Sequence, residues 1–173
     1  MRFPFLVFII LCCNLASPSL HATPLHVQIG YLAYHPDQGP VLSNILPEPA
    51  DSGLKGAELG LQDNTTTGRF LKHQYALRSE LTETPQQALT TARQWLDQGI
   101  KLLITALPSD LLSELTQLAQ QHQALVFNAG NADDKLRTEH CQPNLLHTLP
   151  SRAMLTDALA QWATFRRIKH WLL

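Results

Sequence analysis

Short apolar runs alternate with amphipathic segments along most of this chain. The runs that predict strands cover residues 26–34, 74–81, 100–105, 124–127 and 145–148. Most of them lack regular polar alternation, which is typical of parallel strands that are covered on both faces. A helical segment between two such strands makes a βαβ unit. The sequence therefore predicts an α/β fold, a doubly wound and mostly parallel sheet of the Rossmann-like kind.

The first predicted helix begins at Asp51 or Ser52, either of which can cap it. The polar run 63–68 (Asp-Asn-Thr-Thr-Thr-Gly) has turn chemistry and is expected to end the helix. Gly56 and Gly60 lie four residues apart, and we expect these small residues to let the helix approach the sheet closely.

Three further helices are predicted after the second, third and fifth strands. Thr84 and Pro85 form a strong start signal for the first of them, which ends at Gly99. The next begins near Asp110, and the last begins after Ser151. We expect their apolar stripes to lie in the core. These stripes comprise Ala88, Leu89, Ala92, Trp95, Leu96, Leu111, Leu112, Leu115, Leu118, Ala119, Leu155, Ala158, Leu159, Trp162 and Phe165.

Two loops follow the predicted central strands. Residues 106–109 (Ala-Leu-Pro-Ser) follow one strand, and residues 128–131 (Asn-Ala-Gly-Asn) follow the next. In an open α/β sheet, ligands bind beyond the carboxyl ends of the strands, where loops and helix N-termini present polar groups. The sequence therefore predicts that these loops lie side by side and form a binding rim.

The first residues of the chain have the pattern of a targeting segment. Arg2 precedes an apolar run over residues 3–15, which is too short to span a bilayer, and a small residue stands at Ala22. This pattern indicates a secretory signal peptide over residues 1–22, and cleavage would leave no stable membrane anchor. An uncleaved anchor is the alternative.

Cysteine and charge content narrow the function further. Cys12 and Cys13 lie inside the apolar run, so the mature protein would keep only Cys141 and could form no disulfide within the chain. The full chain has a formal charge of −1. Its basic residues form only one small cluster, at residues 166–169, which argues against nucleic acid as a partner.

Catalytic and metal-binding motifs have little support. The chain has no Gly-x-Ser-x-Gly elbow, His-Glu-x-x-His motif, Walker loop or Gly-x-Gly-x-x-Gly motif, so we expect neither an enzyme nor a bound cofactor. Metal binding is the alternative hypothesis that the largest number of residues supports, although their spacing matches no closed zinc pattern. The residues concerned are Asp133, Asp134, His140, Cys141 and His147.

Several segments together resemble the type I periplasmic solute-binding proteins of ABC importers, of the branched-chain amino acid-binding type. They are the signal peptide, Ile29-Gly30-Tyr31, Gly53-Leu54-Lys55-Gly56-Ala57 and the two rim loops. Two further segments resemble the branch found with quinoprotein (PQQ-dependent) alcohol dehydrogenase systems. These are residues 63–70 and 147–154.

The resemblance implies a two-lobed protein that traps a small solute between its lobes. Residues 23–168 would form the N-terminal lobe, and residues 169–173 would begin a truncated second lobe. The membrane subunits of the transporter would then be partners. In the family's amino acid binders, the second lobe normally supplies the acidic partner of the ligand's amine.

Six residues are candidates for ligand binding. The resemblance implies ligand-binding groups in two loops. The hydroxyl after the family's third strand corresponds by position to Ser109. The main-chain groups and the side chain after the fourth strand correspond to Ala129 and Asn131. Gly130 would allow close approach of a ligand. The alternatives are that Ser109 only caps a helix and that residues 128–131 form only a turn.

Tyr34 and His35, just past the first strand, complete this set. They could line the same cleft or form an exposed loop pair.

The sequence thus favours a non-enzymatic periplasmic protein that binds a small polar solute for an ABC transporter, with a possible link to PQQ-dependent alcohol oxidation. The alternative is a non-transport accessory protein of such an oxidation system, which acts through protein contacts or metal delivery.

Overall fold

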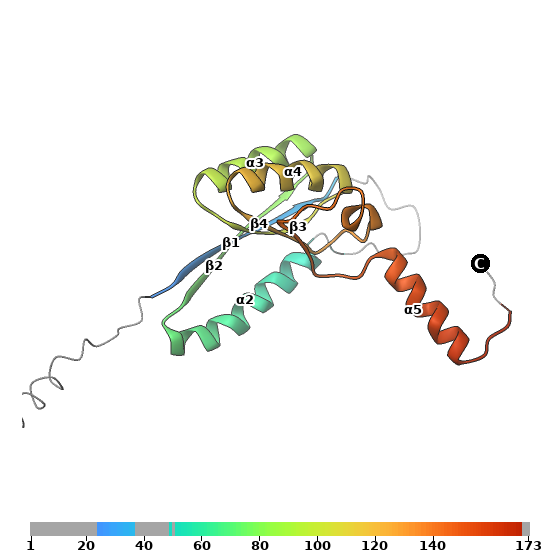
Figure 1. Ribbon diagram of the computed structural model, residues 1–173. Coiled ribbons are helices and arrows are strands. Elements are labelled where there is room, and N and C mark those ends of the chain that lie inside the picture. The colour runs from blue at the N-terminus through green and yellow to red at the C-terminus, as the bar shows by residue number, and fades with distance from the viewer. Residues whose placement is uncertain (1–23, 37–48, 50, 171–173) are drawn as a thin grey trace, which may run out of the picture.

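The computed structural model describes residues 24–36, 49 and 51–170, and it places a parallel sheet between two layers of helices (Figure 1). The strands follow the order β2-β1-β3-β4-β5, and every adjacent pair is parallel. The α/β doubly wound fold that the apolar runs predict is therefore confirmed. The strands are β1 (His26–Tyr34), β2 (Gln74–Thr82), β3 (Leu102–Ala106), β4 (Leu125–Asn128) and β5 (Leu145–His147).

The direction of each crossover decides which face a helix covers. The connection from β1 to β2 runs one way along the sheet, and those from β2 to β3 and from β3 to β4 run the other way. Right-handed crossovers then place α2 (Ser52–Leu71) on one face, and α3 (Pro85–Asp97) and α4 (Ser109–Gln121) on the opposite face (Figure 1). A short 3₁₀ helix, η1 (Asp134–Arg137), and α5 (Arg152–Phe165) complete the described elements.

The core lies between the sheet and the layer of α3 and α4. Thr84 starts α3 with the predicted capping box, in which its side chain accepts from the N–H of Gln87. The apolar stripes of α3 and α4 pack into the core as predicted, and Trp95 is its largest fully buried side chain. Gly30 of β1 faces this ring, because a Cβ added there would lie 2.6 Å from Cε3 of Trp95.

Helix α2 is longer than its sequence predicts. The expected end at residues 63–68 is wrong, because the helix continues to Leu71. Within this run, the side chains of Asn64, Thr65 and Thr66 each donate a hydrogen bond to the carbonyl four residues earlier. Residues that favour turns are accommodated in a helix when their polar groups bond to its own backbone in this way.

Helix α2 approaches the sheet closely at glycines other than the expected ones. The role predicted for Gly56 and Gly60 is wrong, since a Cβ added at either position would meet no atom within 4 Å. An added Cβ at Gly53 would instead collide with the hydroxyl oxygen of Tyr31, and one at Gly68 would lie 2.7 Å from Cε2 of Tyr75. The glycines at the two ends of α2, rather than those in its middle, allow it to pack on the sheet.

The apolar stripe of α5 is not buried within the described chain. Leu155, Leu159 and Trp162 are each 54% exposed and Phe165 is 82% exposed, so the core position predicted for them is wrong. An apolar stripe is buried only when another surface lies against it. Helix α5 extends away from the sheet (Figure 1), and no described element covers its stripe.

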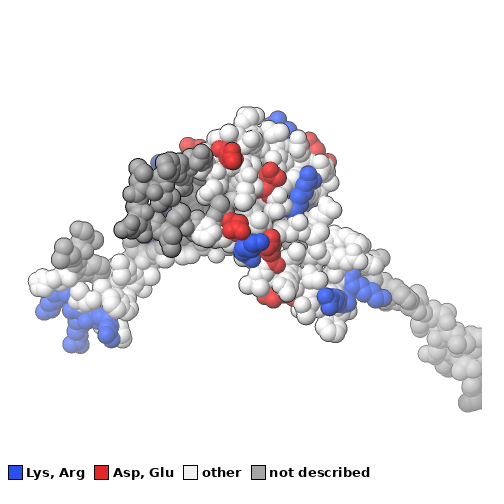
Figure 2. All heavy atoms as spheres, turned by 180° about the vertical axis from the view of Figure 1, so that it is seen from behind, with Lys and Arg blue, Asp and Glu red and all other residues white. Residues whose placement is uncertain are grey.

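Charged side chains of both signs are interspersed over much of the face seen in Figure 2. The basic residues Arg166, Arg167 and Lys169 follow the end of α5 and are exposed. No helix in the described part of the chain is long and apolar enough to cross a membrane. The predicted signal peptide, residues 37–48 and 50 after β1, and the last three residues lie outside the described residues.

Candidate functional site

The carboxyl ends of the parallel strands meet at one edge of the sheet. Ala33 of β1 pairs with Ala106 of β3, and Thr105 of β3 pairs with Asn128 of β4. Loops 106–109 and 128–131 therefore leave neighbouring strands at the same level. This register brings the two loops side by side, as the sequence predicts.

Between these loops and the end of β1 lies an open cavity of about 570 Å³. Four of the six candidate residues line it, namely Tyr34, Ser109, Gly130 and Asn131. The remaining lining residues are Ala106, Leu107, Pro108, Ala132, Asp133 and Arg152. The cavity lies where the strand order reverses between β1 and β3, which is the usual ligand position in this class of sheet.

Ser109 is the first residue of α4, and its hydroxyl does not cap the helix. Pro108 occupies the N-cap position and makes no side-chain capping bond, so the interpretation of Ser109 as an N-cap is wrong. The Ser109 hydroxyl instead donates to Oδ2 of Asp133 over 2.6 Å. This bond joins the start of α4 to the segment that follows β4.

Asn131 connects the two loops through its side chain. Its Nδ2 donates to the carbonyl oxygen of Leu107 at 3.0 Å and to Oγ of Ser109 at 3.1 Å. Its Oδ1 accepts from the N–H of Asp133 at 3.0 Å. These partners fix the orientation of the amide, because a flipped group would face a carbonyl with its oxygen.

Asn128, the last residue of β4, is fully buried and organises the turn that follows it. Its Oδ1 accepts from the N–H groups of Gly130 and Asn131, and its Nδ2 donates to the carbonyl of Asn131. The N–H of Ala129 donates to the carbonyl of Thr105. The amides predicted to hold a ligand at this loop are thus already bonded within the protein.

Gly130 allows the two loops to touch. A Cβ at this position would lie 2.7 Å from Cβ and 2.9 Å from Cα of Ala106, which is closer than carbon atoms pack. Any larger residue would separate the loops and change the shape of the cavity.

The two candidates after β1 differ in position. Tyr34 lines the cavity, whereas His35 is not among its lining residues. The backbone N–H of His35 donates to the carbonyl of Thr82 over 2.8 Å, which continues the pairing of β1 with β2. Ala129 also lies outside the lining and contributes to the rim through its backbone.

Asp133 and Arg152 line the cavity, and the sequence did not mark either as a ligand-binding residue. The hydroxyl of Ser109, the N–H of Lys135 and the charge of Arg152 hold the pKa of the Asp133 carboxyl below its usual range. The side chain is therefore ionised at neutral pH. Asp133 lies only two residues beyond the predicted loop, so extending the rim by two positions would have included it.

The carboxylate of Asp134 has different hydrogen-bond partners from that of Asp133. Its carboxylate accepts from the N–H of Ala153 at 3.1 Å, and its pKa is lowered by hydrogen bonds from Ser151 and Ala153. It thus anchors the start of α5 rather than lining the cavity. Within the described residues, no three His, Cys, Asp or Glu side chains are grouped so that they could hold a metal ion.

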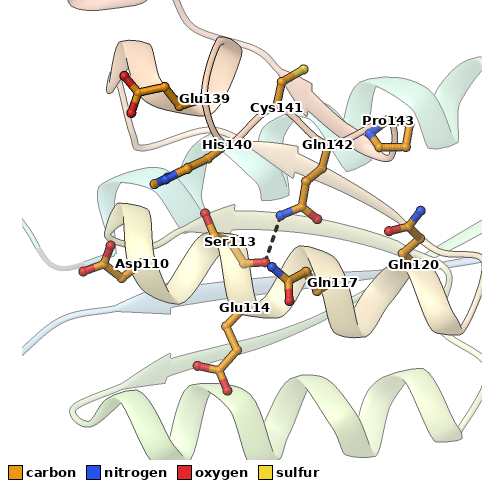
Figure 3. Close-up of a pocket in the computed structure, with 10 residues that line it drawn as sticks. All are labelled: Asp110, Ser113, Glu114, Gln117, Gln120, Glu139, His140, Cys141, Gln142 and Pro143. Atoms are coloured by element: carbon orange, nitrogen blue, oxygen red, sulfur yellow. Dashed lines mark hydrogen bonds between the residues drawn. The ribbon is translucent and has the colours of Figure 1, made fainter.

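A second open cavity, of about 630 Å³, lies beside α4. Figure 3 shows that side chains from one face of α4 and from the segment 139–143 line it, including His140 and Cys141 from the metal hypothesis. Gln142 donates from Nε2 to the carbonyl of Ser113 at 3.1 Å and holds the segment against the helix. The two cavities share no lining residue, so this one is separate from the rim.

The family follows from comparison with known proteins. Residues 45–173 match the sequence model of the family described as periplasmic binding proteins. The chain belongs to this family. No curated protein sequence matches the chain closely enough to serve as a relative.

Solved structures of similar fold include an ABC transporter substrate-binding protein and a possible branched-chain amino acid-binding protein. One from Desulfitobacterium hafniense, in complex with Leu, has a TM-score of 0.62 and 18% identity, covering 82% of this chain and 39% of that chain. A possible leucine/isoleucine/valine-binding protein from Rhodopirellula baltica SH 1 has a TM-score of 0.59 and 14% identity, covering 87% of this chain and 39% of that chain. At these identities the likeness shows the fold, and this chain spans about 39% of the length of both proteins.

The binding-protein lobe also contains a histidine that is expected to make its stability depend on pH. Asn128 donates from Nδ2 to Nδ1 of His147 over 3.0 Å, so the neutral ring must carry its proton on Nε2. Burial and the charge of Arg137 lower the pKa of His147 below its ordinary 6.5. A base whose pKa is lowered by folding stabilises the protein above its unfolded pKa, and this stability is lost as the pH falls.

We therefore expect the chain to lose stability as the pH falls below 6.5 towards the lowered pKa of His147. In His147→Asn the Oδ1 atom occupies nearly the position of the ring Nδ1 and can accept the same hydrogen bond without titrating, so this contribution should be absent. Urea unfolding of both proteins between about pH 8 and pH 5 tests this. Parallel pH profiles of the two proteins would contradict the prediction.

Proposed function

We propose that this chain is the ligand-binding lobe of a periplasmic substrate-binding component of an ABC transporter. In this proposal the cavity at the rim holds a small polar solute. The observation that carries the proposal is the position of a polar cavity at the carboxyl edge of the sheet, beside the point where the strand order reverses. Family membership supports it, as does a neighbour of the same fold whose structure contains Leu.

Each candidate residue has a proposed part in binding. Tyr34 offers an aromatic wall, and Ser109 and Asn131 fix the polar floor through their mutual hydrogen bond. Gly130 allows the close contact of the loops, while Ala129 and His35 hold the loop and strand ends in place.

The wider parts of the proposal concern location and partners. Residues 1–22 would direct the chain to the periplasm, residues 23–168 would form the first lobe, and residues 169–173 would begin the second. The exposed stripe of α5, which includes Trp162, is available to pack against that lobe. Closure of two lobes would bury the solute and present an altered surface to the membrane subunits. The motifs at residues 63–70 and 147–154 favour a solute connected with PQQ-dependent alcohol oxidation.

A thermal-shift panel tests the proposal. The chain would be heated with millimolar amino acids, alcohols, pyrroloquinoline quinone or divalent metal ions. We expect one class of small organic solute to raise the melting temperature, because a ligand that binds only the folded state stabilises it. In the double variant Ser109→Ala, Asn131→Ala we expect the Kd of that solute to rise at least about tenfold.

The matched control removes the same residue types elsewhere. Ser79 and Asn64 are exposed and lie outside the cavity, so the double variant Ser79→Ala, Asn64→Ala should keep the wild-type Kd. A response to metal ions alone, abolished by a chelator, would support the accessory-protein alternative instead. Equal loss of affinity in both double variants would contradict the proposed site.

A further inference from the structure

The hydrogen bonds of the rim determine which polar groups remain for a ligand. Ser109 has one hydroxyl proton, and it is directed to Oδ2 of Asp133 over 2.6 Å. An ionised carboxylate can only accept hydrogen bonds, so Ser109 must be the donor in this contact. Its oxygen in turn accepts from Nδ2 of Asn131. Ser109 therefore has no proton left with which to hold a ligand carboxylate.

The loop after β4 also offers few donors. Every backbone N–H from Ala129 to Asn131 already has an acceptor within the protein, and so does the N–H of Asp133. A ligand that approached this loop would meet groups whose protons are directed inward. The chemistry of the loop thus favours a ligand that donates hydrogen bonds.

Asp133 provides the acceptor for such a ligand. Its Oδ2 accepts one hydrogen bond from Ser109, and its Oδ1 accepts one from the N–H of Lys135 at 3.1 Å. A carboxylate has about four acceptor positions, so about two remain, and the residue lines the cavity. Among the described residues, Asp133 forms no salt bridge within 4.0 Å. Its negative charge therefore lacks a directly contacting cation.

We propose that Asp133 selects a solute with an ammonium group and receives that group in the rim cavity. The inference rests on the proposed function, and it names the residue that gives the site its charge preference. Ser109 and Asn131 act as positioning residues, because their chain of hydrogen bonds holds the carboxylate in place. Arg152, which lines the same cavity, supplies donors for an anionic group at the other end of a zwitterion.

This assignment differs from what the resemblance implies. In the family's amino acid binders, the acidic partner of the amine normally comes from the second lobe, whereas Asp133 lies in the first. The described lobe would then prefer ammonium-bearing solutes before any second lobe closes over them.

Three probes of similar shape test the contributions of the ammonium group and the carboxylate to binding separately. L-Leucine carries both charges, L-leucinamide keeps the ammonium group without the carboxylate, and N-acetyl-L-leucine keeps the carboxylate without the ammonium group. Binding to the chain would be followed by amide chemical shifts at millimolar probe concentrations. We expect leucine and leucinamide to shift resonances of residues that line the rim cavity, and to bind at least about tenfold more tightly than N-acetyl-leucine.

The decisive variant is Asp133→Asn, which removes the charge but keeps an oxygen that can accept from Ser109. We expect its Kd for leucinamide to rise at least tenfold, while its Kd for N-acetyl-leucine stays the same or falls. The ratio of the two constants is measured on one protein preparation, so a partial loss of folding does not change it. Asp134→Asn is the matched control, because this neighbouring carboxylate bonds to Ala153 outside the cavity, and it should keep the wild-type ratio.

The possible failures are distinguishable. If leucine binds at the rim but Asp133→Asn keeps the wild-type ratio, the assignment of Asp133 is overturned and the proposed function stands. If N-acetyl-leucine binds as tightly as leucinamide, the preference for an ammonium group is overturned. If none of the three probes binds and the thermal-shift panel finds no organic solute, both proposals fail.

Discussion

Replacing Asn128 with alanine is expected to lower the free energy of unfolding by about 3 kcal/mol, because it removes all the hydrogen bonds of a fully buried side chain and leaves their partners, which lie in the loop and on His147, without that contact. The side chain is fully buried and makes four hydrogen bonds, to the carbonyl of Asn131, to Nδ1 of His147 and to the N–H groups of Gly130 and Asn131. An orphaned polar group costs about 1–3 kcal/mol when it is buried, and because these groups are only partly buried, water and relaxation of the loop recover part of that cost. Urea unfolding at pH 8 measures the effect.

The same substitution should also affect binding, since Asn128 holds the loop that carries Gly130 and Asn131. We expect Asn128→Ala to weaken binding of any rim ligand even at temperatures where the protein remains folded. Asn64→Ala is the control, because Asn64 is exposed and makes one hydrogen bond within α2. That change should alter stability by less than about 0.5 kcal/mol. A loss below about 1 kcal/mol in Asn128→Ala would contradict the role assigned to this side chain.

Substituting alanine for Gly30 is expected to cost about 2–3 kcal/mol through overpacking. Its added Cβ would lie 2.6 Å and 2.8 Å from two ring atoms of Trp95, and 2.9 Å from Cδ2 of Leu103. All three residues belong to well-packed regions, and Trp95 is only 1% exposed. The ring is almost fully buried, so the methyl group can be accommodated only if the ring, β1 or α3 shifts. Thermal and urea unfolding measure the loss.

Gly60→Ala provides the matched control for this overpacking. No atom lies within 4 Å of the added Cβ, and alanine is the better helix former, so this variant should gain about 0.5–1 kcal/mol. A second test combines Gly30→Ala with Trp95→Phe, which makes room for the methyl group. The double variant should lose less stability than the two single variants together. Strictly additive losses would show that the clash with Trp95 is not the cause.

The fold was predictable because its determinants are local. Strand ends, the Thr84 capping box and the apolar stripes of α3 and α4 all follow from residues a few positions apart. The meeting of the two rim loops follows too, because consecutive buried strands joined by a helix must be parallel.

The failures arise where a local pattern is compatible with more than one structure and its surroundings in the folded chain decide between them. The polar run in α2 has turn chemistry, yet its side chains bond to the helix and α2 continues to Leu71. Gly56 and Gly60 have the expected spacing but face open space, whereas Gly53 meets Tyr31. The stripe of α5 has the right period for a core helix, but no described element lies against Trp162.

At the candidate site, too, the local sequence determines some features and the folded chain determines others. The sequence by itself determined where the rim forms and which residues could stand there, since hydrophobic spacing sets the strands and therefore their ends. Only the tertiary structure decided what those residues offer to a ligand. The proton of Ser109 is directed to Asp133, a residue 24 positions away, and Asn128 takes up the amides of its own loop. Hydrogen-bonding capacity is used up by neighbours in space, and these are fixed only when the chain has folded.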